Sequence, residues 1–266
     1  MRKTRIPGRV LTILAFVFLY MPIVVLVVYS FNSGKSRSIW TGFTLDWYKQ
    51  LLSNRMILNS LWITLLVSVI AALVATVAGT FSAVGLFNLK KRVRAVLLGI
   101  NQIPVINADI ITGVSMMILF VSARSVLGFK LGFGTLLIAH ITFNIPYVIL
   151  SVMPKLYQLD NNLFEAAQDL GATWIQAFYK VILPEIRPGI VNGLLIAFTM
   201  SIDDFVISYF TAGNSTQTLS MTIYAMTRRR ISPEINAIST LMFAVVLTLL
   251  LVVNVRQMRE SAKRLP

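Results

Sequence analysis

The chain has 266 residues, of which 56% are hydrophobic and only 13% are charged, and its mean hydropathy is +0.77. This composition excludes an ordinary soluble domain, which is about a quarter charged, and is typical of a bundle of membrane spans. The net charge of +14 then indicates basic loops at a membrane surface rather than a nucleic-acid partner, while zero cysteines and one histidine exclude disulfides and a Cys- or His-based metal cluster.

Six stretches are long and apolar enough to span a membrane, which takes roughly 20 residues. We expect spans at about 10–31, 57–87, 95–123, 133–153, 188–210 and 235–255. The first run is too long for a signal-peptide core and lacks a small-residue cleavage site, so we expect it to be retained. The sequence therefore predicts an all-α, six-span permease domain over 1–266, with a long loop at 154–187.

The distribution of lysine and arginine predicts the orientation of these spans. With the N-terminus inside, the inner segments hold 15 basic residues and the outer segments hold 9. This bias places both termini in the cytoplasm. The outer run Arg228–Arg230 opposes the bias, and two accounts of it stay open: contact with lipid headgroups, or docking to an acidic patch on an external protein.

The outer loop 32–56 contains Trp47 within FTLDWYKQLL, a stretch that predicts a short helix in the membrane interface. The alternative is an ordinary aromatic belt. The same loop begins with SGKS, which imitates the end of a phosphate-binding loop. That motif needs a glycine where this chain has Tyr29, so we expect no nucleotide site here.

The inner loop 154–187 predicts two short helices. Apolar residues recur at helical spacing after Asn162, and Gly171 should end the first helix because glycine readily adopts the left-handed conformation. The second helix should run from about Thr173 to Ile182, with Pro184 and Pro188 at its end. Taken alone, this pattern fits an ordinary amphipathic hairpin on the membrane surface.

The spacing Glu165-Ala166-Ala167, three residues, Gly171, nine residues, then Val181-x-Leu183-Pro184 resembles the EAA signature of binding-protein-dependent ABC importer permeases. The usual isoleucine is Val181 here. The resemblance implies a type I importer permease fold, in which this loop is the coupling helix that docks on a separate ATPase dimer. It implies coupling roles for Glu165, Ala166, Ala167, Gly171 and Pro184, with ATP and magnesium bound on the partner and none on this chain.

Three acids lie inside the predicted spans: Asp109, Asp203 and Asp204. Charged side chains within spans usually face a bundle interior or a water-filled path. Helical rise places Asp109 about 21 Å and Asp203 about 22 Å from the inner ends of their spans, so the acids should meet at one depth. Asp204 shares a predicted helix face with two serines, so we expect it to line the path and Asp203 to bond a neighbouring helix. A purely packing role is the alternative for each acid.

Two further polar residues, His140 and Asn144, lie one helical turn apart in the fourth predicted span. For both we expect interhelical hydrogen bonds rather than contact with cargo. Pro104 and Pro146 should kink their helices. Met200 should fill a gap in the packing, as the other methionines should.

Spaced carboxylates with aromatic faces suit an organic cation, and Trp47 and Tyr209 could supply such faces. Few metal ligands are available, and we expect no metal site. The segments YMPIVVLVVYSFN, HITFNIPYV, FTMSIDDFVISYF and SPEINAIST resemble the PotC-type permease of spermidine/putrescine importers. That resemblance implies polyamine uptake by alternating access in a bacterial inner membrane. It also implies a second homologous permease, an external solute-binding protein and surrounding membrane lipids as partners.

Other functions stay open at this point. A permease for another small solute would keep the inner loop and give the acids a packing role. A cation-coupled secondary transporter would use the same acids without an ATPase. A membrane-embedded lipid transferase needs several spaced acids near a membrane surface, and an adjacent pair within one span fits that chemistry poorly.

Overall fold

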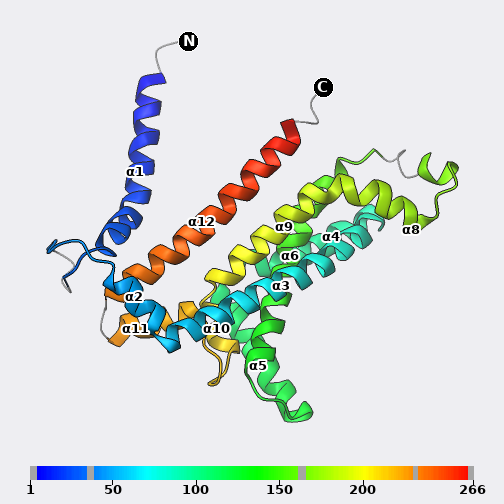
Figure 1. Ribbon diagram of the computed structural model, residues 1–266. Helices are drawn as coiled ribbons and strands as arrows, with labels where there is room; N and C mark the ends of the chain where they lie inside the picture. The colour runs from blue at the N-terminus through cyan, green and yellow to red at the C-terminus, as the bar shows by residue number, and fades with distance from the viewer. Residues whose placement is uncertain (1–4, 35–38, 161–165, 230–232, 263–266) are drawn as a thin grey trace. The chain divides into compact units, whose positions relative to one another are not determined.

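The computed structural model describes residues 5–34, 39–160, 166–229 and 233–262 (Figure 1). Within these ranges every regular element is a helix, and the only β pairing is the isolated bridge between Asn32 and Phe43, which confirms the all-α class. Five described stretches are long and apolar enough to cross a membrane: Gly8–Tyr29, Arg55–Phe87, Asp109–Leu127, Phe133–Tyr157 and Ile175–Asp203. The sixth predicted span falls in α12 (Pro233–Ala262), in which the described apolar stretch covers Pro233–Thr248.

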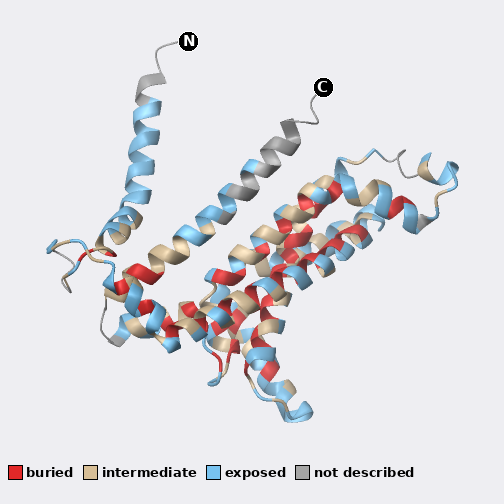
Figure 2. Cartoon of the chain, viewed as in Figure 1, coloured by how far each residue is buried: buried red, intermediate tan, exposed pale blue. Residues whose placement is uncertain are grey.

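Two compact units make up the chain, residues 1–58 with 223–266 and residues 59–222. In the first unit α12 packs beside α1 (Arg5–Tyr29) and α2 (Asp46–Ser53). The apolar stretch of α1 is exposed along its length (Figure 2), as expected for a surface solvated by lipid. Helix α2 confirms the short helix predicted for the outer loop. The chain passes between the units within α3 (Arg55–Phe87) and α11 (Leu219–Arg229).

The core of the second unit lies between α3, α6 (Phe133–Tyr157) and α9 (Leu183–Asp203). Small residues let these helices approach closely: a Cβ on Gly79 of α3 would lie 2.7 Å from Val148 of α6, and one on Gly189 of α9 would lie 2.9 Å from the Ser151 carbonyl oxygen of α6. Membrane helices associate largely through such close packing, because lipid removes the hydrophobic drive for association.

The third predicted span is not one helix. It consists of α4 (Lys91–Ile106) and α5 (Asp109–Leu127), separated by Asn107 and Ala108 in extended conformation. The prediction of one span over 95–123 is therefore wrong. The break falls where polar residues replace apolar ones, and Asp109 becomes the first residue of α5, a position at which the helix dipole favours an acid. Pro104 lies inside α4 and does not end it.

The fifth predicted span differs at both ends. The second loop helix does not stop at the prolines: α8 (Trp174–Ala177), the π-helical turn η1 (Phe178–Ile182) and α9 follow one another without a gap. At the far end, α9 finishes at Asp203, and the short helix α10 (Val206–Thr211) begins three residues later. The predicted range 188–210 is thus wrong in two respects: the helix continues back into η1 and α8, and it is broken after Asp203.

Candidate functional site: an acidic pocket at two helix breaks

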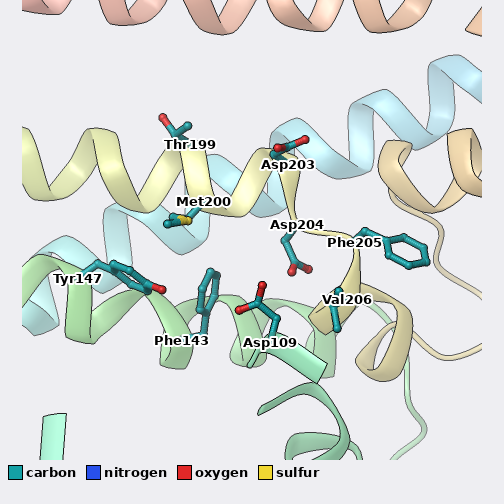
Figure 3. A pocket seen from close by; sticks show the side chains of 9 residues that line it. All are labelled: Asp109, Phe143, Tyr147, Thr199, Met200, Asp203, Asp204, Phe205 and Val206. Atoms are coloured by element: carbon teal, nitrogen blue, oxygen red, sulfur yellow. The ribbon is translucent and has the colours of Figure 1, made fainter. Parts of the chain in front are cut away.

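A pocket of about 400 Å³ lies where the two broken spans meet (Figure 3). Residues from α5, α6, α9 and the start of α10 line it: Asp109, Phe143, Tyr147, Thr199, Met200, Asp203, Asp204, Phe205 and Val206. The three acids predicted from the sequence thus come together. They do so because two helix breaks lie side by side, and not because two continuous helices reach the same depth.

The breaks also decide how the adjacent acids point. Asp203 is the last residue of α9, whereas Asp204 has an extended backbone with φ −65° and ψ 126°. In Figure 3 the carboxylates of Asp204 and Asp109 point into the same space, and Asp203 is directed away from both. The helical-face argument for this pair therefore fails, since it assumed a continuous helix.

Asp204 is the bonded member of the pair. Its Oδ1 accepts a hydrogen bond from the Ile207 N–H at 3.2 Å, and its Oδ2 accepts one from the Ser208 N–H at 2.7 Å. These bonds satisfy donors that would otherwise be orphaned at the start of α10. The side chain is only 7% exposed and its Oδ2 lies 3.5 Å from Nε2 of His140.

Asp109 and Asp203 are both exposed, and neither forms a hydrogen bond or ion pair with any residue that the structure describes. The expectation that Asp203 bonds a neighbouring helix is therefore wrong. Of the three acids, Asp204 is the one that hydrogen bonds hold in the pocket wall. Asp109 and Asp203 keep their acceptor capacity for a guest.

Aromatic rings form one wall of the pocket. Phe143 and Tyr147 lie one turn apart on α6, with ring centroids 5.7 Å apart and ring planes at 76°. Phe205 contributes a third ring from the break itself. Negative carboxylates beside aromatic faces attract an ammonium group. Within the described part of the chain no three His, Asp or Glu side chains gather closely enough to hold a metal ion.

Several of these wall residues were missed by sequence reasoning. Phe143 and Tyr147 carried a usable signal, because they follow His140 at helical spacing on a polar stretch of a span. Phe205 and Val206 carried none, since they reach the pocket only through the break. Met200 was predicted to be a gap-filler but lines the pocket.

The two predicted aromatic path residues lie elsewhere. Tyr209 is an exposed residue of α10 that does not line the pocket, and its ring centroid lies 5.5 Å from that of Phe205. Trp47 belongs to the first unit, is 8% exposed, and donates its indole N–H to the Asn32 carbonyl at 2.7 Å. This bond anchors the chain between α1 and α2. A path role for either residue stays a prediction.

The predicted interhelical bonds of the fourth span are half confirmed. Nδ1 of His140 lies 2.6 Å from the Ser201 hydroxyl of α9, and Nε2 lies 3.0 Å from the Ser208 hydroxyl of α10. Asn144 is fully buried, but neither of its amide atoms bonds to a described residue, so the prediction is wrong for Asn144.

The inner loop carries the predicted helix end at Gly171. This residue has φ +84°, and the Ala172 N–H bonds to the Ala167 carbonyl at 3.1 Å, as in a Schellman motif. Thr173 then begins the next helix: its N–H bonds to Oε1 of Gln176, and its hydroxyl accepts the Gln176 N–H. A capped helix end and a capped helix start therefore meet at this corner.

The remaining predicted coupling residues are placed only in part. Ala166 is exposed, Ala167 is half-buried, and Pro184 lies exposed in the first turn of α9. Glu165 lies outside the described residues. Three large apolar side chains on this segment are also exposed: Leu170, which is 89% exposed, Ile175 and Tyr179. Phe178 is instead buried, and its ring packs against that of Phe81 of α3 with centroids 6.4 Å apart.

Broken membrane helices around a polar pocket, joined to a capped helical corner outside the spans, define a transport subunit. The chain belongs to the family of binding-protein-dependent transport system inner membrane components, whose family model matches residues 75–259. This membership identifies it as a permease of ABC importers.

Two curated relatives are similar over most of their length. The putrescine transport system permease protein PotI of Escherichia coli K12 is 38% identical over 246 residues, covering 91% of this chain and 88% of PotI. The spermidine/putrescine transport system permease protein PotC of Haemophilus influenzae is 37% identical over 238 residues, covering 90% of each chain.

A solved bacterial ABC transporter that imports alginate contains a chain with the same fold, at a TM-score of 0.71 and 18% identity, covering 96% of this chain and 97% of that one. An amino acid ABC transporter aligns at a TM-score of 0.58 and 19% identity, covering 82% of this chain and 100% of that one. Both matches support the fold of this permease class and say nothing of its cargo.

Proposed function

We propose that this chain is the permease subunit of an ATP-driven importer of polyamines. The observation that carries the proposal is the pocket, where carboxylates from two broken spans face aromatic rings. Polyamines are chains of methylenes that carry ammonium groups, so they need acidic contacts beside apolar or aromatic surface. The relatives named for putrescine and spermidine transport support the same cargo class.

The pocket chemistry fits passage rather than tight capture. Asp109 and Asp203 lie exposed, where solvent weakens an ion pair, and Asp204 is already occupied by backbone donors. A cation would therefore be attracted and released readily. This suits alternating access, in which the cargo site opens first to the outside and then to the cytoplasm.

The inner loop is the proposed contact with the ATPase dimer. Residues 166–184 combine small side chains at Ala166 and Ala167, the capped corner at Gly171, and exposed apolar residues. The buried ring of Phe178 packs on the core formed by α3 and α6, so movement of this segment would reach the spans. ATP and magnesium would bind on the partner, and this chain would carry no cofactor.

The complete importer would add a second homologous permease and an external solute-binding protein, within a bacterial inner membrane. Both chain ends would lie in the cytoplasm, as the lysine and arginine bias favours. Because the chain has no cysteine, single cysteines placed near each end can be labelled with a membrane-impermeant reagent in intact cells. Labelling from outside would contradict this orientation.

The decisive experiment is uptake by the complete importer, reconstituted in liposomes with ATP inside. Labelled putrescine and spermidine should accumulate, and unlabelled amino acids and sugars should not compete. Asp109→Asn should lower uptake at low polyamine by about two- to fivefold, the size expected when one solvent-exposed ion pair is lost. Asp46→Asn, which removes an exposed acid on α2, is the matched control and should have no effect. Competition by a neutral solute, or normal uptake by the Asp109 variant, would overturn the proposal.

A further inference from the structure

His140 is the one imidazole of the chain, and it spans the break between α9 and α10. It projects from α6 and is 1% exposed. One ring nitrogen contacts Ser201 in the last turn of α9, and the other contacts Ser208 in α10. A single rigid side chain therefore touches both halves of the broken span.

A helix break leaves backbone groups without intrahelical partners, and in lipid these groups must be satisfied inside the protein. Asp204 accepts two N–H donors at the start of α10, and the Ser220 hydroxyl donates to the Asp204 carbonyl at 2.7 Å. The two bonds to the carboxylate hold α10 to the break residue, and the bond from Ser220 ties α11 to it. The imidazole adds the connection that runs from α9 to α10 through a third helix.

The protons on the ring can be assigned from its neighbours. A neutral imidazole donates one hydrogen bond and accepts one, so one serine hydroxyl accepts a hydrogen bond from the ring and the other donates one to it. Nε2 also lies 3.5 Å from Oδ2 of Asp204. A proton on Nε2 faces a carboxylate and a hydroxyl oxygen, which favours that tautomer and leaves Nδ1 to accept from Ser201.

We propose that His140 is a positioning residue that bridges the α9–α10 break from α6 and thereby holds the Asp204 carboxylate in the pocket wall. The ring does not line the pocket. It lies one layer behind the wall, where it contacts the edge of Phe143 at a centroid distance of 6.3 Å. Its effect on cargo would therefore pass through Asp204 and α10.

Two amide substitutions separate this role from simple space-filling. A glutamine amide can place its nitrogen near the position of Nε2, and an asparagine amide near that of Nδ1. His140→Gln should keep the contacts with Ser208 and Asp204, and the KM for polyamine uptake should stay within about threefold of the parent. His140→Asn should lose those contacts and raise KM about tenfold, with the assembled complex still formed.

The uptake assay rests on the proposed function, so a second readout is independent of the cargo. Val206→Cys places a single thiol in the pocket wall at the start of α10 of this cysteine-free chain. In a complex whose partners also lack reactive cysteines, His140→Asn should raise the rate of reaction with a small charged thiol reagent about fivefold, and His140→Gln should not. Equal behaviour of the two variants in this assay overturns the role of His140, whereas absent polyamine uptake by the parent would instead overturn the cargo.

A serine pair keeps the proposal testable if the histidine variants do not assemble. Ser208→Ala removes one partner of the ring and should raise both the KM and the thiol reaction rate. Ser68→Ala removes a fully buried hydroxyl of α3 that bonds to no residue in the described ranges, so it controls for loss of a buried oxygen. If Ser208→Ala matches Ser68→Ala in both measurements, His140 does not act through the break.

Discussion

Helix α9 is irregular at both ends, and the two irregularities have different causes. At its start the chain contains Pro184 and Pro188 and nevertheless stays helical. Just before Pro184 the turn η1 takes π geometry, in which the Leu183 N–H bonds to the Phe178 carbonyl. At its end the chain contains neither proline nor glycine between Thr199 and Phe205, yet the helix stops at Asp203.

The difference shows which interactions decide a helix boundary in this protein. A π turn shifts the hydrogen-bonding pattern by one residue, and here it directly precedes Pro184, which has no N–H to donate. The break at the other end is instead held open by partners from elsewhere: the Asp204 carboxylate, the Ser220 hydroxyl and the imidazole of His140. At its start, α9 is continuous with the inner-loop helix. At its end, the break forms part of the pocket wall.

The largest expected effect tests the corner before the start of α9. Gly171→Pro places a residue locked near φ −65° where the chain has φ +84°, which should cost about 3 kcal/mol or more locally. We expect ATP hydrolysis by the assembled importer to continue while polyamine uptake is lost. Gly128→Pro is the matched control, because Gly128 also has positive φ but caps α5, away from the inner loop. Coupled uptake by the Gly171 variant at the parental rate would contradict a docking role.

The next effect tests how firmly the first half of α9 is held. Gly189→Ala puts a Cβ 2.9 Å from the Ser151 carbonyl oxygen, and the overpacking should lower the stability of the purified protein by about 1–3 kcal/mol. Gly99→Ala, in α4, meets no atom within 4 Å and should instead stabilise its helix by up to about 1 kcal/mol. Thermal unfolding in detergent measures both. Equal shifts of the two variants would mean that α6 and α9 are not in close contact.

Much of the fold could be predicted because hydrophobic periodicity and capping are local. The apolar runs located α1, α3 and α6, and Gly171 located a helix end, since each depends on residues within a few positions. Both breaks that build the pocket depend on distant partners. No residue near Asp204 in the sequence predicts that His140 and Ser220 will stabilise a helix break there.

The candidate site was therefore predicted in composition but not in geometry. Asp109, Asp203 and Asp204 stand out as acids in apolar stretches, which marks them as pocket residues. Helix faces could not predict which acid forms hydrogen bonds, because Asp204 lies beyond the end of α9 and is not helical. Trp47 shows the reverse case: a prominent aromatic residue whose indole is engaged by the Asn32 carbonyl.

A smaller effect separates the adjacent acids at the end of α9. Asp204→Ala removes the acceptor for two backbone donors and should cost about 1–2 kcal/mol in thermal unfolding, whereas Asp203→Ala should change stability by less than about 0.5 kcal/mol. Asp204→Asn keeps an acceptor oxygen but not the charge, so it should reduce polyamine uptake with assembly and ATPase binding intact. Unchanged uptake by Asp204→Asn would remove this residue from the cation path.

The smallest effect on stability tests the π turn at the start of α9. Pro184→Ala restores a backbone N–H, so the turn can become an ordinary α-helix at a change of less than about 1 kcal/mol in the free energy of unfolding. Relaxing the π turn would rotate the inner-loop segment by about 100° relative to α9, because one residue subtends that angle. We therefore expect near-parental thermal unfolding together with more ATP hydrolysed per polyamine imported. Pro188→Ala, beyond the π turn, is the control and should keep the parental ratio, because the turn through which the inner loop joins α9 is then unaltered. The same ratio in both variants would mean that the π turn accommodates a proline and has no part in coupling.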